Sequence, residues 1–161
     1  MPEIKIKTII NAKRLIVFDL SRSIDLHKIS TEHTNETAID GKTEGLIELG
    51  EFVTWRAKHF GIYQHLTSKI TKYDRPNSFT DEMVKGAFKS FKHDHYFKEV
   101  NGRTEMIDLF TYESPLGILG NIADSLFLEN YIKRLLIKRN DTIKLYAESG
   151  KWEELLTSTQ K

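Results

Sequence analysis

Histidine and aromatic side chains alternate in the middle of the chain in a pattern that could carry chemistry. Phe91, His93, His95 and Phe97 are spaced two residues apart, so they share one face of a predicted strand. The two phenylalanines mark that face as buried, and both histidines therefore point inward with them. A buried imidazole needs a partner or changes its protonation, and a carboxylate is the natural partner.

Two aspartates are candidates for that partner. Asp108 shares a strand face with Phe110 and Tyr112, and Asp81 shares one with Phe79. Apolar residues also occupy the opposite faces of these two strands, so the direction of Asp81 and Asp108 stays open. The aromatic residues beside each aspartate favour the direction into the protein. If both aspartates point inward, a polar group forms among aromatic rings: His93, His95, Asp81 and Asp108 beside Trp55, Phe91 and Phe110.

The elements that must position these residues follow a clear order. Two short helices, within 11–20 and 21–29, are expected between the first two strands. Asn101-Gly102 is a strong hairpin signal between the last two strands. Alternation predicts seven strands, over about 4–10, 34–40, 51–60, 62–73, 79–85, 89–99 and 104–113.

The periodicity then changes to that of one long helix over 116–148, ending near Gly150. Consecutive hairpins make the sheet antiparallel, and a long amphipathic helix buries its apolar side best across the concave face of such a sheet. The helix also has a basic side, which we expect to be a solvent-exposed stripe: Lys133, Arg134, Lys138, Arg139 and Lys144.

Composition narrows the classes of protein. The 161 residues fit one domain, which we expect over 1–150, with 151–161 as a polar tail whose Trp152, Leu155 and Leu156 could dock back. The 24 Lys and Arg against 23 Asp and Glu argue against a general nucleic-acid binder or a polybasic membrane-surface protein.

Cysteine is absent, which excludes disulfides and thiol catalysis. The first residues contain no signal-peptide or transmembrane run, so we expect a cytoplasmic protein without integral membrane association.

Several short stretches in this order resemble the SRPBCC superfamily, which includes START, Bet v 1-like and polyketide-cyclase-like proteins. The chain is most similar to small bacterial cyclase/dehydrase-like members. The resemblance implies an α+β helix-grip fold, in which a seven-stranded antiparallel sheet wraps around a long C-terminal helix. It also implies a cavity for an apolar small molecule, but no particular reaction. The stretches that carry it are Ile10-Asn11-Ala12, Val17-Phe18-Asp19, Gly50 to Trp55, Gly86-Ala87-Phe88, His93 to Phe97 and Tyr112 to Gly117.

Strand parity and the resemblance together predict the residues of the ligand site. They are Trp55, His59, Gln64, Leu66, Asp81, Met83, Phe91, His93, His95, Asp108, Phe110, Ile122 and Leu126. His27, His33 and His65 are not assigned a role.

The polar group in this site has several interpretations. It could be structural pairing in a wide sheet, or a polar anchor that orients a carbonyl or hydroxyl of the ligand. It could also be an acid–base pair of His93 and Asp108. A metal is the remaining option, with His93 and His95 as ligands and His59 as a third. Because no metal motif of higher specificity occurs, we expect neither metal nor cofactor.

The leading functional hypothesis is a carrier or sensor of a hydrophobic small molecule, such as a lipid, quinone, polyketide or aromatic metabolite. The alternative is a cyclase- or dehydratase-like enzyme that uses His93 and Asp108. A third hypothesis is an interaction protein that uses its basic helix or outer sheet face. A homodimer is possible, and a nucleic-acid partner is not expected.

Overall fold

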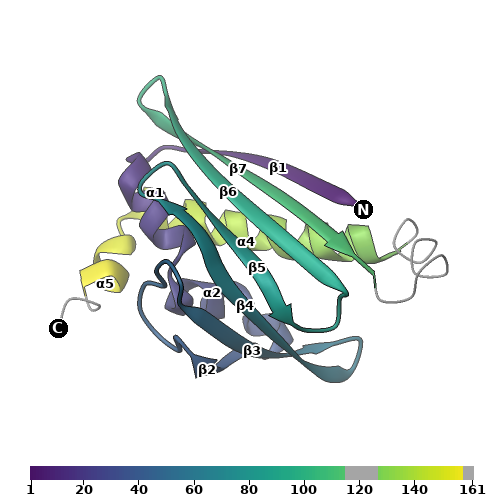
Figure 1. The fold of residues 1–161 in the computed structure, drawn as a ribbon. Helices are drawn as coiled ribbons and strands as arrows, with labels where there is room; N and C mark the ends of the chain where they lie inside the picture. The colour runs from purple at the N-terminus through teal and green to yellow at the C-terminus, as the bar shows by residue number, and fades with distance from the viewer. Residues whose placement is uncertain (115–126, 158–161) are drawn as a thin grey trace.

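Seven strands form one antiparallel sheet in the computed structural model, which describes residues 1–114 and 127–157 (Figure 1). Their order across the sheet is β1-β7-β6-β5-β4-β3-β2, so the first strand returns to pair with the last. The strands are β1 (Glu3–Ile10), β2 (Thr37–Gly41), β3 (Phe52–His59), β4 (Ile62–Asp74), β5 (Ser78–Lys85), β6 (Ser90–Val100) and β7 (Arg103–Glu113).

The helices lie on one side of this sheet. Two short helices, α1 (Arg14–Ser21) and α2 (Ile24–Ser30), and a 3₁₀ turn, η1 (Glu32–Thr34), connect β1 to β2. The long helix α4 (Glu129–Ser149) lies along the sheet and ends at Gly150, whose φ of 77° is the left-handed conformation that commonly terminates helices (Figure 1). The predicted antiparallel sheet with a C-terminal helix is thereby confirmed.

The start of the second strand differs from the sequence prediction. The second strand begins at Thr37 rather than near 34, because the preceding residues form the 3₁₀ turn. The first part of the predicted long helix, with Ile118, Ile122 and Leu126, lies outside the described residues.

Burial confirms the parity of the two strands that carry the histidines. Phe91, His93, His95 and Phe97 are all buried on β6. On β7, burial alternates strictly through Asp108 and the aromatic residues beyond it. The Asn101-Gly102 turn has φ values of 51° and 74°, as a two-residue hairpin requires, and it fixes the register that places His95 opposite Asp108.

The apolar core has two parts, with Leu66 in contact with both. One lies under α1, α2 and the C-terminal half of α4 and includes Phe18, Phe97 and Ile143. The other surrounds Phe110 and the N-terminal half of α4. The segment after Gly150 forms a further helix, α5 (Trp152–Thr157), whose Trp152, Leu155 and Leu156 pack against the first part.

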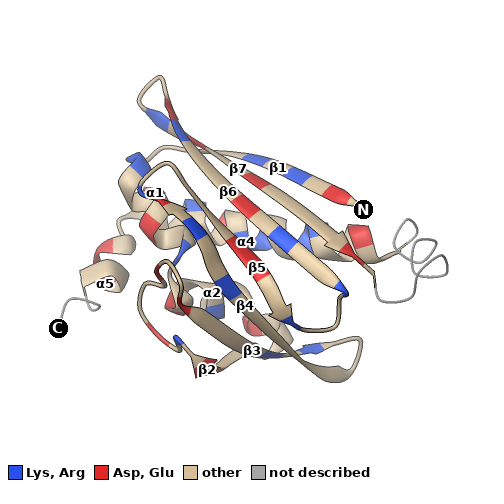
Figure 2. Cartoon of the chain, in the orientation of Figure 1, with Lys and Arg blue, Asp and Glu red and all other residues tan. Residues whose placement is uncertain are grey.

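The outer face of the sheet is charged and mixed in sign. Figure 2 shows Lys and Arg interspersed with Asp and Glu along the strands. His65 is exposed on this face, as its parity in β4 predicts. Among the described residues, no helix combines the length and apolar character needed to cross a membrane.

Candidate functional site

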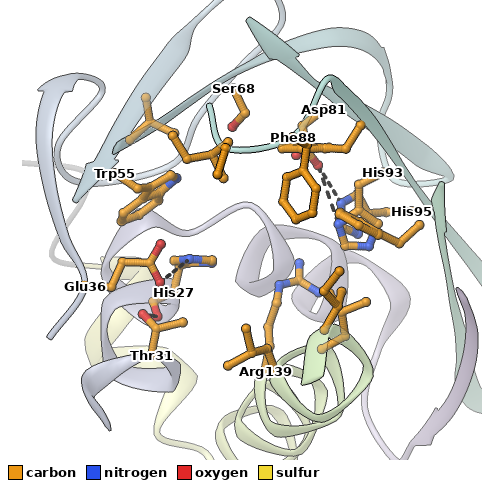
Figure 3. A pocket seen from close by; sticks show the side chains of 18 of the residues that line it. His27, Thr31, Glu36, Trp55, Ser68, Asp81, Phe88, His93, His95 and Arg139 are labelled. Atoms are coloured by element: carbon orange, nitrogen blue, oxygen red, sulfur yellow. Dashed lines mark hydrogen bonds and ion pairs between the residues drawn. The ribbon is translucent and has the colours of Figure 1, made fainter. Parts of the chain in front are cut away.

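A cavity of about 520 Å³ lies between the sheet and the helices. Strands β3 to β7 supply one wall, and α2 and α4 supply the other (Figure 3). Much of the lining is apolar or aromatic: Trp55, Leu66, Ile70, Phe79, Phe91, Phe110, Ile132 and Leu136. A concave apolar site with a few polar groups is the usual form of a small-molecule site.

Most of the residues predicted for the site line this cavity: Trp55, His59, Gln64, Leu66, Asp81, Phe91, His93, His95 and Phe110. Met83 does not; it packs beside the second part of the core. Asp108 has the predicted inward parity but lies behind the histidines and is fully buried. Ile122 and Leu126 lie outside the described residues.

Two histidines and two aspartates form a continuous polar group at one end of the cavity. His93 donates Nε2–H to Asp108 Oδ1 over 3.0 Å, and His95 donates Nδ1–H to the same oxygen over 2.9 Å. His95 Nε2 lies 2.9 Å from Asp81 Oδ1 on the neighbouring strand β5. The register of β5, β6 and β7 therefore places each histidine between two carboxylates.

Helix α4 holds the buried carboxylate from the other side. Asn140 donates from Nδ2 to Asp108 Oδ2 over 2.6 Å, and Arg139 approaches Oδ1 at 3.4 Å. Arg139 also donates to the backbone oxygen of Ser21 in α1. Asp108 thus links the sheet, α4 and, through Arg139, α1.

The charges in this group follow from burial and hydrogen bonding. Burial alone would raise the pKa of Asp108, but hydrogen bonds from His93 and His95 and the charge of Arg139 bring it well below its ordinary value. The pKa of Asp81 is also lowered, because its bond to His95 outweighs burial. Burial lowers the pKa of His93, with the charge of His95 acting in the same direction. The pKa of His95 is raised, since its bonds to Asp108 and Asp81 outweigh burial.

A second polar group lies across the cavity from the first (Figure 3). Glu36 pairs with His27 at 3.4 Å, and the His27 ring packs on Trp55 with centroids 4.3 Å apart. Burial would raise the pKa of Glu36, but the charge and hydrogen bond of His27 and a bond from Thr31 lower it. Nearby, His59 Nδ1 lies 2.8 Å from the hydroxyl of Tyr131 on α4, and burial lowers the pKa of His59. The cavity is therefore apolar in the middle and polar at two ends.

One edge of the cavity is formed by exposed aromatic rings. Phe60 lines the cavity with about half of its surface exposed, and its ring lies 4.6 Å from that of Tyr131 and 5.4 Å from that of Phe127. Phe60 also has a φ of 53°, which is unusual for a residue with a large side chain. Phe60 is therefore a solvent-exposed part of the cavity lining.

The sequence prediction did not include Arg139, His27 or Glu36, all of which line the cavity. Arg139 was expected in the exposed basic stripe of the helix, but it is buried and faces the cavity, so that prediction was wrong. A signal was present, because Arg139 falls within the apolar series Ile132, Leu136 and Ile143. His27 was assigned no role, yet it lines the cavity one helical turn after the buried Ile24, which lines it too.

Comparison with solved structures gives close matches in fold at low sequence identity. The protein TTHA0849 from Thermus thermophilus matches with a TM-score of 0.69 and 16% identity, over 88% of this chain and 97% of that one. Ginseng major latex-like protein 151 from Panax ginseng matches with a TM-score of 0.67 and 16% identity, over 91% and 97%. Ara h 8.0201 matches with a TM-score of 0.65 and 10% identity, over 91% of this chain and 97% of that one. The chain has the Bet v 1-like helix-grip fold.

This assignment confirms the fold expected from the resemblance to the SRPBCC superfamily. Neither the family models nor the curated proteins contain a match to the chain. A helix-grip domain carries many different functions on one scaffold, so the activity must be argued from the cavity itself.

Proposed function

We propose that this helix-grip protein is a carrier or sensor that binds a hydrophobic small molecule in the cavity between sheet and α4. The observation that carries the proposal is the cavity of about 520 Å³, whose lining is mainly apolar but has polar groups at opposite ends. Burial of apolar ligand surface would supply the affinity. Polar groups at fixed positions would orient the ligand.

The two ends define the expected ligand. At one end, His93, Asp81 and Arg139 line the cavity and can bind a carbonyl, hydroxyl or acidic group. At the other end, Glu36 and His59 can accept or donate further hydrogen bonds. The ligand class is an elongated apolar molecule with oxygen functions, such as a lipid, quinone, polyketide or aromatic metabolite.

A cyclase- or dehydratase-like enzyme is the weaker candidate. The expected acid–base pair is His93 with Asp108, but Asp108 is enclosed by side chains. Its two oxygens already accept hydrogen bonds from His93, His95, Arg139 and Asn140. Asp108 can therefore orient His93, but it is not available to a substrate.

Native mass spectrometry of the purified protein tests the proposal first. We expect a co-purified compound that dissociates under mild activation and can be extracted into organic solvent. Its mass would identify the ligand class.

The two tryptophans allow a matched binding experiment. Trp55 lines the cavity, whereas Trp152 packs on the outside of the core from α5. In Trp152→Phe, dodecanol or dodecanoic acid should change the emission of the remaining Trp55 in a saturable way. In Trp55→Phe, the emission of Trp152 should not respond. If no compound co-purifies and neither probe alters Trp55 emission, the carrier proposal is wrong.

A further inference from the structure

We propose that the polar end of the cavity beside α4 is a binding site for one divalent first-row transition-metal ion, such as Zn²⁺ or Fe²⁺. The protein ligands would be His93, His95 and Asp81. The sequence predicts no metal, and it offers His59 as a third ligand beside His93 and His95. The tertiary structure instead places His59 at the other end of the cavity, beside Tyr131 and near Glu36.

The ligand atoms already converge. One ligand atom from each of Asp81, His93 and His95 lies within 4.8 Å of the other two. Asp81 Oδ1 is 2.9 Å from His95 Nε2 and 3.9 Å from His93 Nδ1. Two ligands of a tetrahedral ion, each about 2.0–2.1 Å from it, lie about 3.3 Å apart. Small rotations of these side chains are enough to close around an ion.

The outer hydrogen bonds of the two rings are those of metal-bound histidines. A histidine ligand nearly always donates its other ring N–H to a carboxylate or carbonyl, which fixes its tautomer and orientation. Both rings donate that N–H to one oxygen of Asp108, at 3.0 and 2.9 Å. The remaining nitrogens, His93 Nδ1 and His95 Nε2, then face Asp81. Asp108 is itself fixed by Asn140.

The charge of the group also favours a cation. Asp81 and Asp108 place two carboxylates around the two imidazoles. Arg139 lies 3.4 Å from Asp108, so the group holds two carboxylates and one guanidinium around the two rings. A divalent ion between Asp81 and the two rings would take the place of the proton that His95 and Asp81 share.

The site has room for additional ligands. All three protein ligands line the cavity, so the open coordination positions of the ion would face that space. Three protein ligands with open positions are typical of reactive rather than purely structural metal sites. Water, or an oxygen atom of a molecule in the cavity, would complete the coordination. In the part of the chain that the structure describes, no other group of His, Asp and Glu converges in this way.

The experiment uses untagged protein that has been stripped with a chelator and then titrated with Zn²⁺ and with Co²⁺. We expect one ion per chain, a rise in the melting temperature with Zn²⁺, and visible d–d absorption with Co²⁺. Asp81→Asn and His93→Gln should each weaken binding by about 100-fold. Asp108→Asn, which removes only the outer carboxylate, should weaken it about 10-fold or more. His65→Ala on the exposed face of β4 is the matched control and should bind as the wild type does.

Circular dichroism of each apo variant keeps the result interpretable if a substitution disturbs folding. Loss of binding in a variant that keeps the wild-type spectrum supports the site. The proposal is overturned if stripped wild-type protein takes up less than one equivalent of either ion. It is also overturned if folded Asp81→Asn and His93→Gln bind as tightly as His65→Ala. Neither result bears on the apolar ligand, which the Trp55 titration tests separately.

Discussion

At the scale of single residues, Asp108 controls the geometry of the polar end. It accepts from two imidazoles on one oxygen and from Asn140 on the other. A buried carboxylate is stable only when its lone pairs are used in this way. The cost of burying this charge is offset by partners from two elements, β6 and α4, so Asp108 fixes side chains that no single strand could orient alone.

Strand parity predicts the direction of Asp108 but not its place relative to the cavity. Alternation on β6 and β7 correctly directed His93, His95 and Asp108 inward. It could not distinguish a side chain that faces the cavity from one that lies behind its neighbours. That difference depends on how the sheet curves around α4, which period-two spacing does not encode.

Glu36 at the opposite end gives a prediction for pH dependence. Its pKa is lowered in the folded protein by His27 and Thr31 despite burial. A lowered carboxylate pKa contributes stability above the unfolded value of 4.5, and that stability is lost as the pH falls further. Glu36→Gln should therefore be less stable than the wild type at pH 7, by about 1 kcal/mol.

The measurement is urea unfolding of both proteins from pH 7 to pH 3. The difference between them should shrink below pH 4.5. Glu32→Gln, at an exposed position of η1, should have a free energy of unfolding close to that of the wild type at every pH. If the stability difference between Glu36→Gln and the wild type stays constant with pH, Glu36 is not the ionised carboxylate that we describe.

At the scale of elements, the last described helix is part of the domain's packing. The sequence predicted a polar tail from 151 and left open whether its apolar residues dock. In the structure, Trp152, Leu155 and Leu156 of α5 contact the core beneath α1 and α4. The domain boundary at 150 remains a prediction, but this docking shows that α5 shares the core.

Trp152→Ala should accordingly lower the free energy of unfolding by about 2 kcal/mol. This is less than the loss for a fully buried tryptophan, because the Trp152 ring is only partly buried. Glu154→Ala, on the exposed side of α5, should change stability by less than about 0.5 kcal/mol. Denaturant unfolding of the two variants and the wild type gives the comparison. Equal stability of Trp152→Ala and Glu154→Ala would mean that α5 does not contribute.

At the scale of the whole molecule, the fold leaves open a space that a stable core would fill. Protein interiors are normally close-packed, so a cavity of this size forgoes contacts that would stabilise the chain. Such a cost is expected where a ligand completes the packing. Ser68 is a suitable probe, because it is buried on β4 and directed into the cavity (Figure 3).

Ser68→Leu should raise the free energy of unfolding by about 1 kcal/mol and weaken dodecanol binding, since the new side chain occupies the space of the ligand. Lys69→Leu, at an exposed position on the outer face of the same strand, should leave dodecanol binding unchanged. Thermal unfolding and the Trp55 titration measure the two effects. Destabilisation of Ser68→Leu would indicate that the space beside Ser68 is already packed.

The seven strands, the Asn101-Gly102 turn and the inward direction of both histidines could be predicted from the sequence, because they depend on local periodicity and turn geometry. Which side chains the two histidines contact could be seen only in the tertiary structure. The register of β5 and β6 sets Asp81 opposite His93, and Asp81 reaches His95 diagonally across the two strands. Arg139 turns inward through the rotation of α4 against the sheet. Contacts between elements depend on curvature, register and helix rotation together, and none of these is fixed by residues close in sequence.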